Sequence, residues 1–208
     1  MIVPTWQTLD VPDGLASADA ASLPLALLTA WHMLRVRARL QPGERVLIQA
    51  GGSGVGVMAI QIARMLGCDV HATASTSERR ERLTALGATA WSYEESGVRD
   101  VDVVVESVGE ATWAASIRAL KWGGRLVCCG ATSGADVKLN LRVLFFKQID
   151  VLGSTMGTRA DMAAAWDAVR AGAIRPVVDC VLPMMEIGRG HERLERRAAF
   201  GKVVLAWE

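Results

Sequence analysis

The chain has few of the residues that build metal sites or disulfide frameworks. Its 208 residues include four cysteines and three histidines, and no two cysteines stand in a C-x-x-C spacing. Three scattered histidines without paired cysteine or acidic ligands do not form a zinc-binding pattern, so we expect no metal. Unpaired cysteines favour a reducing compartment, and we therefore expect a cytoplasmic protein.

The sequence also lacks an excess of charge and any long apolar run. Its 23 basic and 22 acidic residues leave a net charge of +1, which gives no electrostatic reason to expect nucleic acid as a partner. No apolar run reaches the ~18–20 residues that a membrane-spanning helix requires. Residues Met1–Trp6 lack the basic start and apolar core of a signal peptide. We expect neither nucleic acid nor a membrane as a partner.

Short apolar runs alternate with segments of helical periodicity. The predicted strands are Val46–Gln49, Val70–Thr73, Thr89–Trp91, Val101–Val105, Arg125–Cys129 and Gln148–Leu152. The predicted helices are Ala18–Val36, Val55–Leu66, Ser77–Leu86, Ala111–Leu120, Arg159–Ala171 and Glu186–Arg197. Continuous apolar strands indicate a sheet that is covered on both faces. The predicted fold class is α/β, a Rossmann-type, doubly wound, parallel six-stranded sheet with its ligand at the carboxyl ends of the strands.

One predicted connection is unusually short. Only the nine residues Ser92–Asp100 separate the third and fourth predicted strands. In this fold they must cross about three strand spacings, or ~14 Å, and nine extended residues reach ~30 Å. A full crossover helix usually needs a dozen or more residues, so we expect none here.

A glycine-rich turn follows the first predicted strand and opens into a helix. Its sequence is Gly51-Gly52-Ser53-Gly54-Val55-Gly56, so Ser53 occupies the middle position of a G-x-G-x-x-G pattern. A helix N-terminus offers free N–H groups, and glycines let the backbone approach a pyrophosphate. The turn lacks the following Lys-Ser/Thr of a phosphate-loop nucleotidase. The pattern favours a dinucleotide.

The end of the second predicted strand bears on the type of dinucleotide. NAD-binding proteins usually place an acid there, and this chain has none. Ser75 could donate to a 2′-phosphate and Arg79 or Arg80 could pair with it. We therefore favour NADP(H) over NAD(H), although the arginines could instead lie on a solvated first helical turn. His32, inside the first predicted helix, is interpreted as a helix-surface residue because no partner is evident.

Several further segments match a known family in order along the chain. They are Leu23–His32, Gln41–Ile48, the glycine turn, Leu86–Ala88, Val101–Glu106, Gly123–Val127, Leu152–Ser154 and Gly201–Leu205. Together they resemble the medium-chain dehydrogenase/reductase superfamily, in its zinc-type alcohol dehydrogenase and quinone oxidoreductase-like branch. The resemblance covers nearly the whole chain.

The resemblance implies roles for particular residues. Gly51, Ser53, Gly54, Val55 and Gly56 would line the pyrophosphate, and Ser75 and Arg79 would hold the 2′-phosphate. Thr29 would approach the nicotinamide, while Ser107, Val108, Gly109, Gly130 and Ala131 would flank the ribose and nicotinamide. Phe145, Phe146 and Met156 are secondary candidates at the nicotinamide end, although core packing is the favoured role for the two phenylalanines.

The resemblance also implies a domain organisation. Residues 1–16 would be a remnant of the boundary with a GroES-like catalytic domain that is otherwise largely missing. Residues 17–176 would form the dinucleotide-binding domain, and residues 177–208 a C-terminal segment that returns toward the catalytic lobe. The edge strand near Gln148–Gly153 would join two subunits into a homodimer, since an exposed apolar edge invites pairing.

Three functions remain open from the sequence. The first is an NADP(H)-binding oxidoreductase that moves hydride between nicotinamide and a quinone, enone, aldehyde or alcohol. The second is a catalytically inactive dinucleotide-binding module. The third is a methyltransferase-like domain whose glycine turn meets an adenosyl ligand without a pyrophosphate, which Ser75 and Arg79 argue against. The sequence names no general acid and no particular substrate.

Overall fold

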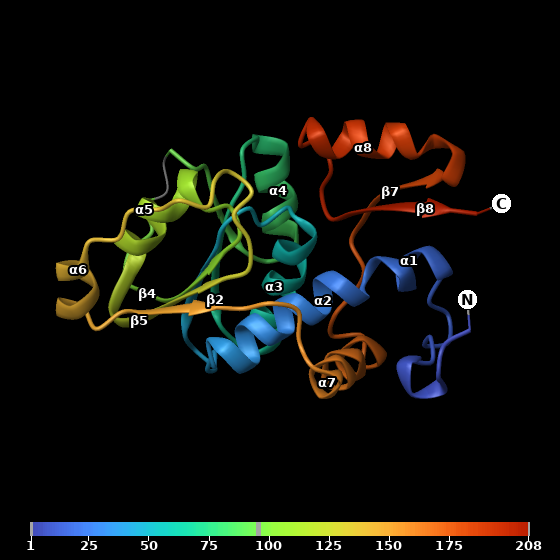
Figure 1. The fold of residues 1–208 in the computed structure, drawn as a ribbon, viewed down its shortest axis with the longest axis horizontal. Coiled ribbons are helices and arrows are strands. Elements are labelled where there is room, and N and C mark those ends of the chain that lie inside the picture. Colours follow the sequence, from blue (N-terminus) through green and yellow to red (C-terminus); the bar gives the residue numbers. More distant parts are fainter. Residues whose placement is uncertain (1, 95–96, 208) are drawn as a thin grey trace.

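A parallel sheet covered by helices on both faces forms the body of the molecule, with a small second sheet at one end (Figure 1). The computed structural model describes residues 2–94 and 97–207, so part of the predicted Ser92–Asp100 connection lies outside the described residues. The helical elements are η1 (Thr5–Gln7), α1 (Ser17–Ser22), α2 (Pro24–Trp31), η2 (His32–Arg37), α3 (Gly54–Met65), α4 (Ser77–Ala85), α5 (Glu110–Ala119), α6 (Leu141–Phe146), α7 (Arg159–Arg170), η3 (Met184–Glu186) and α8 (Ile187–Glu195). The strands are β1 (Arg45–Ile48), β2 (Asp69–Thr73), β3 (Thr89–Trp91), β4 (Val101–Glu106), β5 (Leu120–Cys128), β6 (Asp150–Gly153), β7 (Val178–Pro183) and β8 (Lys202–Ala206).

The large sheet has the strand order β3-β2-β1-β4-β5-β6, and every neighbouring pair is parallel. The sequence order therefore reverses direction between β1 and β4, where such folds bind ligands. All strands point the same way, so the residues that follow them meet at one edge, the carboxyl edge. The predicted six-stranded, doubly wound parallel sheet is confirmed.

The apolar strands are buried because the sheet has a core on each face. Val46 and Ile48 of β1 join the larger core, which α2, α3 and α7 cover, whereas Leu47 joins the opposite core beside α5. Side chains alternate between the faces of a strand, and both faces here are dry. This is why β4 is buried at all six positions.

The predicted helix Ala18–Val36 is wrong as a single element. Pro24 has no N–H to donate, so it interrupts a helix, but it suits the first position of a new one. Accordingly α1 ends at Ser22 and α2 begins at Pro24. The last part, His32–Arg37, continues as a π-helical turn.

Two strands begin more than one residue from their predicted starts. β5 begins at Leu120 rather than Arg125, because a register shift opposite Val101 and Val103 absorbs the intervening residues. β6 begins at Asp150 rather than Gln148, because Gln148 adopts a left-handed φ of +53° that a strand does not accommodate.

The helix α6 and its phenylalanines correct a further expectation. Phe145 and Phe146 are 61% and 62% exposed, so the prediction that they pack in the core is wrong. α6 buries none of its residues, and Asn140 caps it by accepting from Arg142 N at 3.0 Å. Because α6 leads into the amino end of β6, it lies at the edge of the sheet opposite the carboxyl edge (Figure 1).

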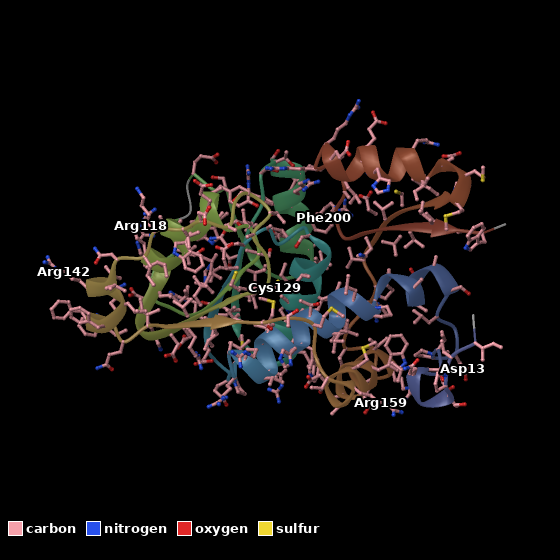
Figure 2. The ribbon with its side chains drawn as sticks, viewed as in Figure 1. Asp13, Arg118, Cys129, Arg142, Arg159 and Phe200 are labelled. Atoms are coloured by element: carbon pink, nitrogen blue, oxygen red, sulfur yellow. The ribbon has the colours of Figure 1, made fainter. Side chains whose placement is uncertain are left out.

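The C-terminal residues build a separate parallel pair, β7 and β8, with α8 beside it. Between α8 and β8 the chain returns to the main body, where Phe200 is 2% exposed (Figure 2). Within residues 2–94 and 97–207, none of the helices is both long enough and apolar enough to cross a lipid bilayer.

Candidate functional site

The glycine turn lies at the carboxyl edge between β1 and α3. Ser53 is the N-cap of α3, and its hydroxyl oxygen accepts from Gly56 N at 3.0 Å. On its β2 side the turn is held by Gly51 N, which donates to Thr73 O at 2.9 Å. Ala50 precedes the glycines in a left-handed conformation, with φ of +50°. The turn thus presents the N-terminus of α3 to the carboxyl edge.

Two of these glycines are required by close packing. A Cβ on Gly56 would lie 2.5 Å from Ala50 O and 2.7 Å from Gly51 O, both backbone atoms that cannot move aside easily. A Cβ on Gly51 would lie 2.8 Å from the Cβ of Ala72 on β2. The tight approach of helix to strand explains the glycine at each position.

The C-terminal segment crosses this turn, which the sequence did not indicate. Gly201 N donates to Gly52 O at 2.8 Å, and the Phe200 ring covers the same glycine. The stem of Lys202 packs against Gly54, so a primary ammonium stands near the N-terminus of α3. No carboxylate in the described part of the chain pairs with that ammonium. Lys202 is a candidate that sequence reasoning missed, although it stands within the Gly201–Leu205 motif.

The residues predicted to bind a 2′-phosphate follow β2. Ser75 is exposed, and Arg80 Nη1 donates to its carbonyl oxygen at 3.3 Å. Arg79 Nη2 donates to Ala199 O at 2.7 Å and also to Arg197 O. The Arg79 guanidinium therefore ties α4 to the C-terminal segment, a contact that the sequence could not show.

Tyr93 lies beside these residues and was also missed. Burial raises the pKa of its phenol, while a hydrogen bond with Thr73 and the nearby charge of Arg79 lower it, and the net shift is upward. The only signal in the sequence was its place two residues after β3, where the chain reaches the carboxyl edge.

The turns after β4 and β5 lie against each other. Ser133 N donates to Val108 O at 2.8 Å, and a Cβ on Gly130 would lie 3.2 Å from Ser107 O. Gly109 has φ of +88°, and a Cβ there would lie 2.4 Å from Gly134 O and 3.0 Å from Ala131 Cα. The structure thus brings together Ser107, Val108, Gly109, Gly130 and Ala131 at the carboxyl edge.

Thr29 lies on α2, which packs over the turn, and His32 begins η2 directly after α2. Ala26 of α2 reaches within 3.7 Å of the Cβ position of Gly54, and Thr29 lies one turn further along, 8% exposed and donating to Leu25 O. The interpretation of His32 as a surface residue is wrong. Its side chain is 16% exposed, and its Nδ1 lies 2.9 Å from Oδ2 of Asp161 on α7.

Asp161 is held at that position by α7 itself. It forms a capping box with Thr158. Burial raises its pKa, but hydrogen bonds from Thr158 and His32 outweigh burial and lower it overall. His32 and Asp161 lie far apart in the chain, so their pairing could not be found from the sequence.

Among the described residues no three or more histidine, cysteine, aspartate or glutamate side chains gather as a metal site would require. The expectation that the protein holds no zinc stays a prediction.

Comparison with known proteins gives a family model and similar curated proteins. A family model described as zinc-binding dehydrogenase matches residues 54–171. Acryloyl-coenzyme A reductase of Metallosphaera sedula is 32% identical over 201 residues, which cover 94% of this chain and 60% of that protein. The chain therefore spans about 60% of the length of that relative.

Solved structures match over nearly the whole chain. The crystal structure of an NAD-dependent alcohol dehydrogenase is 37% identical with a TM-score of 0.92, and the match covers 98% of this chain and 62% of that one. The 2-octenoyl-CoA carboxylase reductase CinF, in complex with NADP and 2-octenoyl-CoA, is 26% identical with a TM-score of 0.93. The match covers 99% of this chain and 53% of that one.

Proposed function

The chain belongs to the zinc-binding dehydrogenase family, and from that membership we propose that it is the NADP(H)-binding part of an oxidoreductase. The dinucleotide would lie along the carboxyl edge, from Ser75 and Arg79 at one end to Gly130 and Ala131 at the other. The observation that carries the proposal is the N-terminus of α3 with Lys202 beside it.

These residues fit a diphosphate. The N–H groups of Gly54 and Val55 begin α3, where neither can be an intrahelical donor. The partial positive charge of a helix N-terminus favours an anion, and the Lys202 ammonium would neutralise a second charge. The close packing at Gly51 and Gly56 excludes a side chain at both positions, so neither residue places one over the turn. An adenosyl ligand without phosphates would leave Lys202 without a partner.

The preference for the 2′-phosphorylated dinucleotide rests on the end of β2. No acid follows that strand, and Ser75, Arg79 and Arg80 do. One relative is named as NAD-dependent and another was solved with NADP, so the relatives do not decide between the two. The guanidinium of Arg79 has N–H groups beyond those that bind the carbonyls of Arg197 and Ala199, and Arg80 stands next to it.

The proposed reaction is hydride transfer. A bound nicotinamide ring supplies or accepts the hydride. The turns at Ser107–Gly109 and Gly130–Ala131 would fix the ring, and Thr29 would border it from α2. The names of the relatives favour a conjugated enoyl thioester, in addition to the quinone, enone, aldehyde and alcohol classes that the sequence leaves open.

We propose two features of the assembly as well. Residues 17–176 form the dinucleotide-binding domain, and residues 1–16 and 177–208 border the catalytic lobe. The separate β7–β8 pair supports this division. Two copies associate through the edge strand β6, where Val151 is 41% exposed and α6 adds the exposed Phe145 and Phe146.

Calorimetric titration with NADPH, NADH and S-adenosylmethionine tests the proposal. We expect micromolar binding of NADPH, weaker binding of NADH and none of S-adenosylmethionine. The matched control is Gly56→Asp, which places a carboxylate at the turn. Binding of NADH at least as tight as that of NADPH would overturn the cofactor preference, and absence of binding by either nucleotide would overturn the proposal.

A second assay separates an enzyme from a binding module. NADPH oxidation is followed with a quinone, an enal and acryloyl-coenzyme A. Turnover well above that of Gly56→Asp would establish catalysis by this chain. Tight binding without turnover would favour the inactive binding module as the function of the chain by itself.

A further inference from the structure

The carboxylate of Glu106 is fully buried at the carboxyl edge, and the proposed hydride transfer gives it no task. It is the last residue of β4, the strand next to β1. A buried charge is costly unless donors surround it. Its Oε1 accepts from Val108 N at 2.7 Å, Gly109 N at 3.1 Å and Thr112 Oγ1 at 2.9 Å. The carboxylate thus organises the turn between β4 and α5.

The other carboxylate oxygen receives a chain of hydrogen bonds that begins in the glycine turn. Ala50 N donates to Thr73 Oγ1 at 3.1 Å, and the Thr73 hydroxyl donates to Gln49 Oε1 at 2.7 Å. Gln49 Nε2 donates to Ser116 Oγ at 3.0 Å, and the Ser116 hydroxyl donates to Glu106 Oε2 at 2.6 Å. This series of hydrogen bonds therefore runs through β2, the end of β1 and α5 before it reaches β4.

Each hydrogen bond in this series is donated in the direction of Glu106. Ser116 and Thr73 each accept from the link before, so the single proton of each hydroxyl goes to the link after. The orientation of the Gln49 amide is fixed by the same bonds. Hydrogen bonds in series polarise one another, so a change at the carboxylate is felt along the chain. Gln49, Thr73 and Ser116 are each 2% exposed or less, so water does not replace a lost link.

The two ends of this network are residues with left-handed backbones. Ala50, at φ of +50°, directly precedes the glycine turn, and Gly109, at φ of +88°, ends the turn after β4. A non-glycine residue rarely adopts a positive φ without support. Each end donates its N–H into the network, so the network fixes the peptide plane at the entrance of one turn and at the exit of the other.

We propose that Glu106 is a positioning residue that holds the glycine turn and the turn after β4 in one fixed relation. The proposal rests on the proposed function, because these turns are taken to hold the two halves of one dinucleotide. Glu106 would touch no part of the ligand. Its effect on affinity would come through Ala50 at one end and through Val108 and Gly109 at the other.

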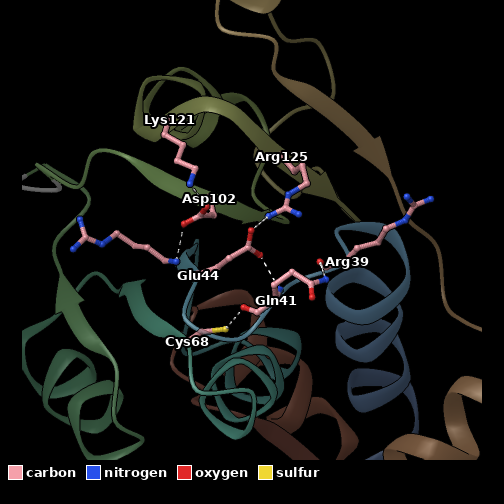
Figure 3. Close-up of polar contacts among 8 residues, drawn as sticks. Arg39, Gln41, Glu44, Cys68, Asp102, Lys121 and Arg125 are labelled. Atoms are coloured by element: carbon pink, nitrogen blue, oxygen red, sulfur yellow. Dashed lines mark hydrogen bonds and ion pairs between the residues drawn. The ribbon is translucent and has the colours of Figure 1, made fainter.

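Two variants and one matched control test the proposal. Glu106→Gln puts an amide among groups that are all donors. Gln49→Met breaks the chain with a side chain of similar size. Asp102→Asn makes the same carboxylate-to-amide change at the other end of β4, where Asp102 is 9% exposed, accepts from Arg45 N and pairs with Lys121 (Figure 3). All three should lower stability, so stability alone does not discriminate.

Cofactor affinity and amide exchange do discriminate. We expect NADPH affinity to fall about ten-fold in Glu106→Gln, less in Gln49→Met and under two-fold in Asp102→Asn. In the double variant of Glu106 and Gln49 the loss should match the larger single loss, because residues in one network are not additive. A double-variant loss equal to the product of the single losses would overturn the proposal.

Hydrogen exchange tests the network without cofactor. In the free Glu106→Gln protein the amide of Ala50 should exchange at least ten-fold faster, as should those of Val108 and Gly109, while Asp102→Asn leaves all three unchanged. An unaltered exchange rate of the Ala50 amide would contradict the proposal whether or not NADPH binds. If the unmodified chain binds no NADPH and the exchange result holds, the cofactor assignment fails and the coupling of the two turns stands.

Discussion

The side chain of Lys202 packs on the backbone of Gly54, so that a Cβ on the glycine would lie 2.8 Å from the lysine Cδ. One residue begins β8 and the other begins α3. The contact adds a side-chain cation to the dipole of a helix N-terminus, and both attract an anion.

Replacing that cation should weaken cofactor binding more than folding. We expect Lys202→Met to reduce NADPH affinity at least about ten-fold, since a charge-assisted contact contributes ~1.5–3 kcal/mol. The melting temperature should stay nearly unchanged because the stem still packs on Gly54. Titration at low and high salt measures the effect, which should shrink as salt screens the charge. Lys138→Met, a change at an exposed lysine, is the control. Equal affinities for Lys202→Met and the unmodified chain would remove Lys202 from the phosphate site.

Arg79 has two roles to separate, because its guanidinium binds the carbonyls of Arg197 and Ala199 and is also proposed to hold the 2′-phosphate. If Arg79 also holds a 2′-phosphate, Arg79→Ala should cost NADPH about ten-fold more affinity than it costs NADH, in addition to lowering stability. Arg142→Ala, at an exposed arginine of α6 outside the proposed site, is the control and should change neither affinity. Equal losses for both nucleotides would leave Arg79 only the structural contact with the C-terminal segment.

Gly56 should tolerate no side chain. Its Cβ would stand 2.5 Å from Ala50 O, so Gly56→Ala must displace the backbone of the turn, and we expect ~1–3 kcal/mol of lost stability, as for overpacked sites. Urea unfolding measures it. In Gly188→Ala the new Cβ meets no atom within 4 Å, and a helical alanine should be neutral or stabilising. Similar stabilities for the two variants would mean that the turn is looser than its geometry implies.

The His32–Asp161 contact predicts a pH dependence of stability. The pKa of Asp161 is lowered in the folded chain, so its contribution is complete above the unfolded value of about 3.9 and is lost as pH falls through the folded pKa. Below about pH 4, the free energy of unfolding of Asp161→Asn should therefore fall less steeply with decreasing pH than that of the unmodified chain. Asp167→Asn, on the same helix but 72% exposed in its side chain, should not. If the free energy of unfolding depended on acid pH in the same way in both variants, this assignment would be contradicted.

The fold and the glycine turn were predictable because their signals are local. Apolar runs, the Gly51–Gly56 spacing and the residues that directly follow each strand define the sheet and its carboxyl edge. The break at Pro24 was equally local and was overlooked. Phe145 and Phe146 were misjudged, because an aromatic pair gives the same sequence signal in a core and on an exposed edge helix.

The rest of the site depends on residues that only the folded chain brings together. Lys202 reaches the glycine turn because the C-terminal segment crosses it, and Asp161 reaches His32 because α7 packs on α2. Glu106 is recognisable in the sequence as a charged residue that ends an apolar strand. Its partner Ser116 lies on α5, and Gln49, which donates to Ser116, directly follows β1. No spacing in the sequence relates these residues.

The free edge of β6 predicts the mode of self-association. Val151 is 41% exposed on this edge strand, and Phe145 and Phe146 extend the apolar surface. Val151→Lys places a charge on the edge, a device by which natural sheets avoid edge pairing. We expect the variant to sediment as a monomer where the unmodified chain is a dimer, with its NADPH affinity kept, because the cofactor would lie at the carboxyl edge and not along β6. The control is Val181→Lys, which introduces the same charge at a 48% exposed valine of β7 and should leave the dimer intact. A dimer that survives Val151→Lys and dissociates in Val181→Lys would move the interface to the β7–β8 pair.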